Sequence, residues 1–173
     1  MKAGGGKNKG SQFEREVCVI LSRWVSKGEH EDLFWRSAMS GGRATVRGKQ
    51  GKNTNNQLGD ISAISPAGHA LTNRFVVEAK FYADLDIDAF LFKSKGKLVQ
   101  FWREIQGIAR KEKREPLLIA KQNRLPTLLI ATPEGMEELG LFDHVCVASI
   151  PCRAHIAFLS KLDKVEFPSW HLS

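Results

Sequence analysis

The sequence is poor in cysteine and has no long apolar run, and these two shortages exclude several classes of protein. Its three cysteines form no Cys-x-x-Cys pair, so neither a zinc site nor a disulfide framework is expected, and a reducing cytoplasm is the expected location. No apolar stretch reaches the roughly 18 residues that cross a bilayer. None follows the basic N-terminus as it would in a secretory signal. We therefore expect no membrane partner.

Negative charge and metal-binding histidine patterns are also scarce. The five histidines lack a spacing such as His-x3-His, and we assign them no role. Asp and Glu number 19 against 26 Lys and Arg, which gives a net charge of +7. A basic chain favours a polyanionic partner, and nucleic acid is the first candidate. The 42% of hydrophobic residues within 173 indicates one domain with a core.

The N-terminal third combines a helix pattern with two segments that lack one. Residues 1–10, rich in Gly, Lys and Asn, are expected to form a flexible basic arm before a single domain over 11–173. Ser11 and Glu14 match a capping box, which predicts that a helix begins at Ser11. Residues 40–59 carry glycine, asparagine and basic side chains without apolar periodicity, which predicts a long mobile loop.

Short apolar runs predict the remaining elements. Strands are expected at 33–38, 60–64, 74–80, 116–120, 127–131, 144–149 and 155–159, and further helices at 97–114 and 133–140. A turn at Pro66-Ala67-Gly68 should join the second and third strands. All four tryptophans are expected in the core. The order of helix, three strands, helix and more strands predicts an α/β domain with a mixed central sheet flanked by helices.

Three charged residues are the candidates for a catalytic site. Glu78 and Lys80 are two positions apart in a predicted strand, so their side chains share one face. If the strand that begins at Asp60 pairs antiparallel with theirs, Asp60 approaches Glu78. Two carboxylates can hold Mg²⁺ or Mn²⁺, which would neutralise a phosphate and lower the pKa of a bound water. The lysine can orient or deprotonate the nucleophile, or stabilise the developing negative charge.

An alternative, purely structural interpretation of the same residues is an ion pair on a surface strand. The apolar run Phe75-Val76-Val77 before Glu78 argues against it, because it indicates a buried strand. In a buried strand a carboxylate and an ammonium group are costly unless they are used.

The arrangement resembles the PD-(D/E)xK nuclease superfamily, with Asp60 as the first acid and Glu78-Ala79-Lys80 as the second half. Four segments, GSQFEREV, WRSAMSGG, GDISAI and FVVEAK, are most similar to archaeal and phage-type Holliday junction resolvases. The resemblance covers about Gly10 to Arg124. It implies a restriction-endonuclease-like core (αβββαβ), a DNA substrate, Mg²⁺ with Mn²⁺ as a substitute, and the cytoplasm of a bacterium or phage-infected host. One departure is that Gly59 precedes Asp60 where proline is common.

The resemblance also implies roles for three further residues. Glu14 matches a helix acid that helps to hold the metal, and its helical angle places it nearer the apolar stripe than Glu16. The alternative is that Glu14 only caps the helix. Ser40 matches a serine that approaches the phosphate, or is an ordinary turn residue. Gln100 matches a polar helix residue of the superfamily.

Five basic residues precede or occupy the expected loop. Their position beside the site makes them candidates for phosphate contacts. They are Arg36, Arg43, Arg47, Lys49 and Lys52.

The sequence favours a structure-selective DNA endonuclease, similar to a junction resolvase and acting on branched DNA. A homodimer is expected because paired cuts need two active sites, and Phe158, Phe167 and Trp170 are candidates for the dimer contact. One alternative is a restriction-like, repair or recombination nuclease acting on duplex, flaps or ends. Another is a non-catalytic DNA-binding protein on a nuclease fold, which the intact Asp60, Glu78 and Lys80 disfavour.

Overall fold

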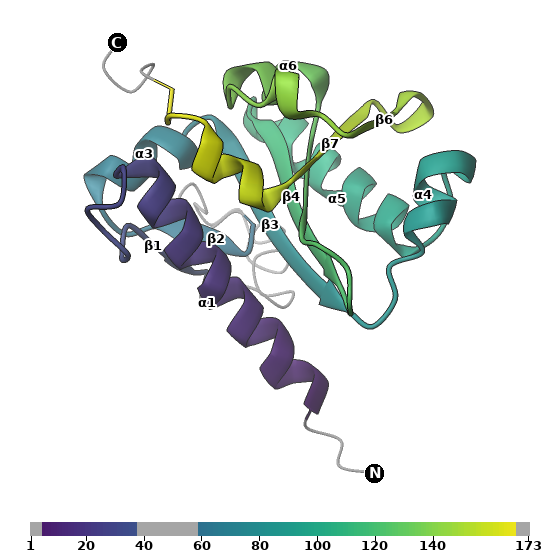
Figure 1. Ribbon diagram of the computed structural model, residues 1–173, viewed down its shortest axis with the longest axis horizontal. Helices are drawn as coiled ribbons and strands as arrows, with labels where there is room; N and C mark the ends of the chain where they lie inside the picture. Colours follow the sequence, from purple (N-terminus) through teal and green to yellow (C-terminus); the bar gives the residue numbers. More distant parts are fainter. Residues whose placement is uncertain (1–4, 38–58, 169–173) are drawn as a thin grey trace.

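The centre of the computed structural model is a five-stranded mixed sheet (Figure 1), and the structure describes residues 5–37 and 59–168. The strands lie in the order β3 (Phe75–Tyr82), β4 (Glu115–Gln122), β5 (Leu128–Ala131), β7 (Ala154–Phe158) and β6 (Val147–Ser149). β3 and β4 are parallel, and the other neighbours are antiparallel. The predicted α/β fold with a mixed central sheet is therefore confirmed, and it is consistent with a restriction-endonuclease-like core.

A second, two-stranded sheet lies beside β3. It consists of β1 (Phe34–Arg36) and β2 (Ile61–Ala63), which pair antiparallel. A single parallel bridge between Gly59 and Val77 connects the segment before β2 to β3. The expectation that the Asp60 segment would pair antiparallel with β3 is therefore wrong. Asp60 reaches β3 through this bridge, in which its N–H donates to the Val77 carbonyl at 3.0 Å.

Helices cover both faces of the large sheet (Figure 1). On one face α1 (Gly5–Val25) packs on β3, and on the other α5 (Lys97–Glu112) packs on β3 and β4. Trp24 of α1 and Trp102 of α5 are buried, as predicted. Trp35 is not, since 55% of it is exposed. Alternate strand residues face opposite sides, and the neighbouring Phe34, which is 1% exposed, takes the inward position. Trp170 lies outside the described residues.

The first helix begins earlier than the capping pattern predicts. α1 starts at Gly5, so Ser11 lies inside the helix and does not cap it, and residues 5–10 are helical where a flexible arm was expected. The Glu14 carboxylate, which a capping box requires, instead pairs with Arg36. No proline interrupts residues 5–10, so the helix extends N-terminal to Ser11 even though Gly5, Gly6 and Gly10 are poor helix formers.

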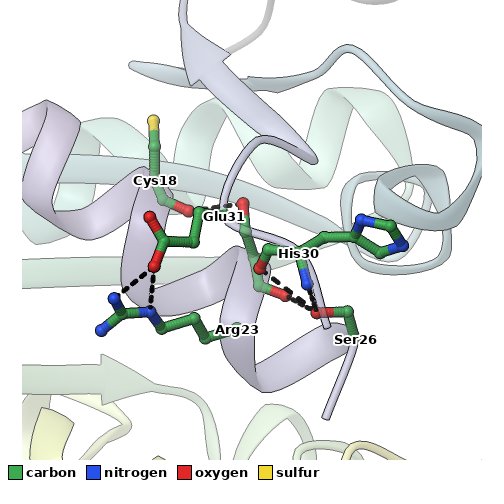
Figure 2. Close-up of polar contacts among 6 residues, drawn as sticks. Cys18, Arg23, Ser26, His30 and Glu31 are labelled. Carbon is green, nitrogen blue, oxygen red and sulfur yellow. Dashed lines mark hydrogen bonds and ion pairs between the residues drawn. The ribbon is translucent and has the colours of Figure 1, made fainter. Parts of the chain in front are cut away.

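Polar contacts hold the turn that follows α1 (Figure 2). Gly28, at φ +92°, donates to the Arg23 carbonyl at 2.7 Å and ends the helix. Arg23 pairs with Glu31, and the Ser26 hydroxyl accepts a hydrogen bond of 2.8 Å from the His30 N–H. These contacts fix the direction in which the chain returns to β1.

Short helices connect the strands. They are α3 (Pro66–Thr72), α4 (Ile87–Lys93), α6 (Pro133–Glu138) and the 3-10 helices η1 (Phe142–His144), η2 (Ile150–Cys152) and η3 (Leu159–Lys164). The predicted turn at 66–68 is wrong: the segment is the start of α3, because proline is pre-organised for a first helical position. No helix was predicted at the position of α4. Within 5–37 and 59–168, no helix is long and apolar enough to cross a membrane.

Two side chains near the C-terminus are part of the chain's own core. Phe167 is 5% exposed and its ring meets that of Trp24 edge to face, with centroids 4.8 Å apart. Phe158 is partly buried against the core under α5. Phe167 therefore does not supply the dimer contact expected of it, because its surface is already used within the chain. Of the three thiols, Cys18 and Cys152 are buried and Cys146, just before β6, is exposed.

Candidate active site

The site forms where the chain crosses the outer edge of β3, and Gly59 makes this crossing possible. Gly59 has φ +81°, a conformation that side-chain-bearing residues rarely adopt. A Cβ added there would lie 2.3 Å from the Val77 carbonyl oxygen. Proline, whose φ is fixed near −65°, cannot take this conformation. Glycine before Asp60 is therefore a requirement of the local backbone and brings Asp60 against β3.

Asp60, Glu78 and Lys80 converge at this edge. Lys80 Nζ lies 2.8 Å from Asp60 Oδ2 and 2.6 Å from Glu78 Oε1. Asp60 Oδ2 also accepts a 3.2 Å hydrogen bond from the Ala79 N–H. Val77 and Ala79, on the opposite face of β3, are buried in the core. The predicted alternation is thus confirmed, and the three charged groups share one small volume.

Burial makes this charge arrangement unusual. The side chains of Asp60, Glu78 and Lys80 are 8%, 19% and 20% exposed. Burial, and next the negative charge of Asp60, raise the pKa of Glu78 to about 7, although Lys80 acts in the opposite direction. Burial alone would lower the pKa of Lys80, but attraction to Glu78 and Asp60 outweighs it and raises that pKa. Lys80 is therefore a firmly protonated cation between two acids that it does not fully neutralise.

The donor set fits a hard divalent cation. Two carboxylates point at one position, now shared with the Lys80 ammonium, and oxygen ligands are those that Mg²⁺ and Mn²⁺ prefer. Within 5–37 and 59–168, no group of three or more His, Cys, Asp or Glu side chains is arranged to hold a metal ion. The described chain therefore offers two converging acids. Mg²⁺ commonly completes its coordination with water and substrate oxygens.

Glu14 lies in a different contact. Its carboxylate forms an ion pair with the guanidinium of Arg36, across from α1 to β1. The Glu14 side chain is 14% exposed and that of Glu16 is 46% exposed, so the predicted orientation toward the apolar stripe is confirmed. Its role as a metal ligand stays a prediction. Arg36, expected to contact phosphate, is held by Glu14 in this structure.

The other predicted DNA contacts are unevenly placed. Gln100 is exposed in the first turn of α5. Four basic residues and one serine lie outside the described residues, and their roles stay predictions. They are Ser40, Arg43, Arg47, Lys49 and Lys52.

Two aromatic residues beside the site were not predicted as functional. The Phe101 ring lies under Lys80, with Nζ 5.7 Å from its centroid. Tyr82 lies against Phe101, with ring centroids 5.3 Å apart and an interplanar angle of 31°. The signal for Tyr82 was present in the sequence, because Glu78, Lys80 and Tyr82 occupy alternate positions of one strand.

Comparison with known proteins places this geometry in a family. A family model described as "Phage putative PDDEXK endonuclease" matches residues 5–143, which include β1 to β5, α1 and α5. The match contains Glu14, Asp60, Glu78 and Lys80. No curated protein and no solved structure matches the chain significantly.

Proposed function

The chain belongs to the phage PDDEXK endonuclease family, and from this premise we propose that it is a Mg²⁺-dependent endonuclease that hydrolyses phosphodiester bonds in branched DNA. Membership supports the predicted PD-(D/E)xK superfamily and a nuclease activity on DNA. The metal dependence, the branched substrate and a homodimeric assembly are the proposed parts. The predicted likeness to Holliday junction resolvases motivates the last two.

One observation carries the proposal: the buried carboxylate of Asp60, the partly buried carboxylate of Glu78 and one ammonium group meet at the edge of β3. A purely structural ion pair needs one acid, whereas Lys80 contacts both Asp60 and Glu78 within 2.8 Å. Surplus negative charge in a buried site is costly unless a cation offsets it. The two carboxylates would hold Mg²⁺, which supplies positive charge against the phosphate and lowers the pKa of a water molecule when bound.

The side chains of the chain itself divide the work. Asp60 and Glu78 would hold the cation, with Asp60 Oδ2 kept in place by the Ala79 N–H and Glu78 carried by β3 itself. Lys80 keeps its proton, so it acts as a fixed positive charge that orients the attacking water and stabilises negative charge developing on the phosphate. Partial burial strengthens this electrostatic effect because surrounding water screens it less.

The substrate proposal depends on symmetry. Resolving a four-way junction takes two nicks related by a two-fold axis, and one chain carries one Asp60–Glu78–Lys80 set. Two chains related by that axis would supply both. The net charge of +7 favours phosphate contacts without base selectivity.

The deciding experiment is cleavage of a panel of labelled DNA: a four-way junction, a flap, a blunt duplex and a single strand. Each is incubated with Mg²⁺ or with EDTA, and an Asp60→Asn variant serves as the control for contaminating nucleases. We expect wild-type cleavage only with Mg²⁺, fastest on the junction, and a dimer by light scattering. Cleavage in EDTA would contradict the metal proposal. A monomer that cuts junction and duplex equally would remove the resolvase proposal.

A further inference from the structure

Beside the charged site, Tyr82, Phe101 and Lys97 form a group that we call the aromatic ledge. We propose that this ledge stacks an unpaired base of the DNA substrate and so selects DNA with single-stranded character next to the scissile phosphate. The proposal rests on the proposed nuclease function and deepens it by naming what the enzyme recognises.

The ledge continues directly from the catalytic residues. Glu78, Lys80 and Tyr82 lie on the same face of β3, each about 7 Å from the next. Phe101 joins the two parts, because its ring contacts both Lys80, with Nζ at 5.7 Å, and the ring of Tyr82, with its centroid at 5.3 Å. A nucleotide bound on the ledge would therefore be a neighbour of the phosphate at the metal site.

Tyr82 offers the accessible ring of the ledge. It ends β3 and is 40% exposed, while Phe101 beneath it is partly buried against the core. An exposed aromatic ring supported by a second ring is a platform on which any base can stack, because every base has a π-face. Duplex DNA cannot use such a platform, since its bases already stack on one another. The ledge therefore suits an unpaired base.

Lys97 adds the positive charge that a nucleotide's phosphate requires. Its Nζ lies over the Tyr82 ring, 5.8 Å from the centroid, so a cation already occupies a position that a base can take. Its Nζ also donates to the Asp84 carbonyl at 3.3 Å, an exposed contact that the long side chain can exchange for the phosphate while the base stacks. A protein partner with an apolar side chain would gain nothing from this ammonium group.

The backbone beneath Lys97 is held firmly. The Lys97 N–H donates to Asp86 Oδ2 at 3.0 Å, and the Leu98 N–H donates to the Leu85 carbonyl at 3.2 Å. A Cβ on Gly96 would lie 2.5 Å from the Asp86 Cβ, so the two segments are in close contact. The nearby acids are engaged with backbone groups: Asp86 as above, and Asp84 Oδ1 with the Asp86 N–H at 3.0 Å. The start of α5 is thus fixed relative to residues 84–86, the segment that directly follows β3.

The test measures binding in EDTA, where no hydrolysis is needed. The full chain is titrated onto a fluorescent duplex with a single-stranded tail and onto the matched blunt duplex. We expect tighter binding of the tailed DNA. Tyr82→Ala and Tyr82→Leu should weaken it by about fivefold to a hundredfold, the range for loss of one stacked base, and leave blunt duplex unaffected. Tyr82→Phe should bind like wild type because the ring is kept.

Two further measurements separate stacking from general damage. A 2-aminopurine in the tail should lose fluorescence on binding to wild type and much less on binding to Tyr82→Leu. Phe92→Ala removes an 81% exposed ring on α4, outside the ledge, and should change nothing. Equal affinity of wild type for tailed and blunt DNA, or unchanged tailed-DNA binding by both Tyr82→Ala and Tyr82→Leu, would overturn the ledge. Failure of cleavage with a preserved, Tyr82-dependent preference would overturn only the nuclease proposal.

Discussion

Two groups of partly buried charged side chains invite comparison: Asp60, Glu78 and Lys80 at β3, and Glu14 with Arg36 between α1 and β1. Their exposures are similar, 8–20% for the first group and 14–25% for the second. The two groups differ in charge balance. The second group pairs one acid with one base, whereas the first sets two acids against one ammonium group.

If the first group holds the proposed metal ion, imbalance of charge, more than burial, distinguishes it from a structural ion pair. In a balanced pair each charge is neutralised by its partner, so removing one partner leaves an uncompensated charge. The unbalanced group holds Glu78 partly protonated near neutral pH, since its pKa is raised to about 7. A divalent cation would complete the first group and would have no such place in the second.

Removing one of the two acids of the first group should have the largest effect. Asp60→Asn or Glu78→Gln should reduce cleavage below detection, a larger loss than the roughly hundredfold to thousandfold seen when one transition-state donor is removed. DNA binding should persist, because repulsion of phosphate decreases. Gel-based cleavage and anisotropy measure the two effects, with Asp88→Asn on exposed α4 as the control. Near-normal cleavage by either variant would show that the site is elsewhere.

Removing the ammonium group of Lys80 tests the contribution of the positive charge in the first group. Lys80→Ala should lower the cleavage rate by about a hundredfold to a thousandfold. Mg²⁺ affinity, measured by calorimetry, should be retained or increase, because an ammonium group no longer competes for the two carboxylates. The exposed Lys93→Ala is the matched control. Lost metal affinity with unchanged turnover would reverse the role given to Lys80.

Gly59→Ala displaces Asp60 without altering any charge. The left-handed backbone costs a non-glycine residue about 1–2 kcal/mol, and the added Cβ collides with Val77. We expect a lower melting temperature and cleavage reduced by about a hundredfold, as for a small misplacement of a catalytic group. Gly107→Ala, in open space on α5, should instead stabilise the protein slightly. Equal behaviour of the two variants would contradict the requirement for glycine at 59.

Glu14→Gln tests whether Glu14 helps to hold the metal or only forms the ion pair with Arg36. If Glu14 helps to hold the metal, as its match to the superfamily acid implies, Mg²⁺ affinity should fall by about tenfold, the lower end of the effect of supporting groups. Glu16→Gln, exposed on the same helix, is the control and should have no effect. A lower melting temperature with unchanged Mg²⁺ affinity would assign Glu14 to the structural pair with Arg36.

The smallest expected effect is the pH dependence of Mg²⁺ binding. The pKa of Glu78 is raised in the folded protein, so its protonated form contributes stability at low pH that is lost as pH rises through about 7. A metal ion competes with that proton. The Mg²⁺-induced rise in melting temperature should therefore grow between pH 6 and 8, with affinity falling by up to about tenfold for each unit below 7. A pH-independent Mg²⁺ effect would contradict this.

Local periodicity predicted much of the fold and part of the site. Alternation along a strand placed Glu78 and Lys80 together, and the order of elements predicted the mixed sheet. The direction in which Asp60 approaches could not be predicted, because it depends on one bridge between Gly59 and Val77. Two-residue alternation shows that Trp35 and Phe34 face opposite ways, but it does not show which side packs on α1.

Contacts between distant segments account for the other misses. The capping pattern at Ser11 was misleading because Glu14 has its partner on β1, 22 residues away. The aromatic ledge joins the end of β3 to the start of α5. Nothing in the sequence distinguishes Phe101 from the other apolar residues of its helix, since no local pattern shows that Lys80 lies above its ring.

The distribution of thiols makes the molecule convenient for labelling. Cys18 and Cys152 are buried, and burial, then the charge of Glu14, raise the pKa of Cys18 to about 12, which suppresses its reactive thiolate. Cys146 is exposed next to β6, the strand at the opposite edge of the sheet from β3. Four inter-strand steps of about 4.8 Å separate the two edges. A maleimide dye should therefore attach at one known position, far enough from the proposed active site to report DNA arrival by energy transfer without obstructing it.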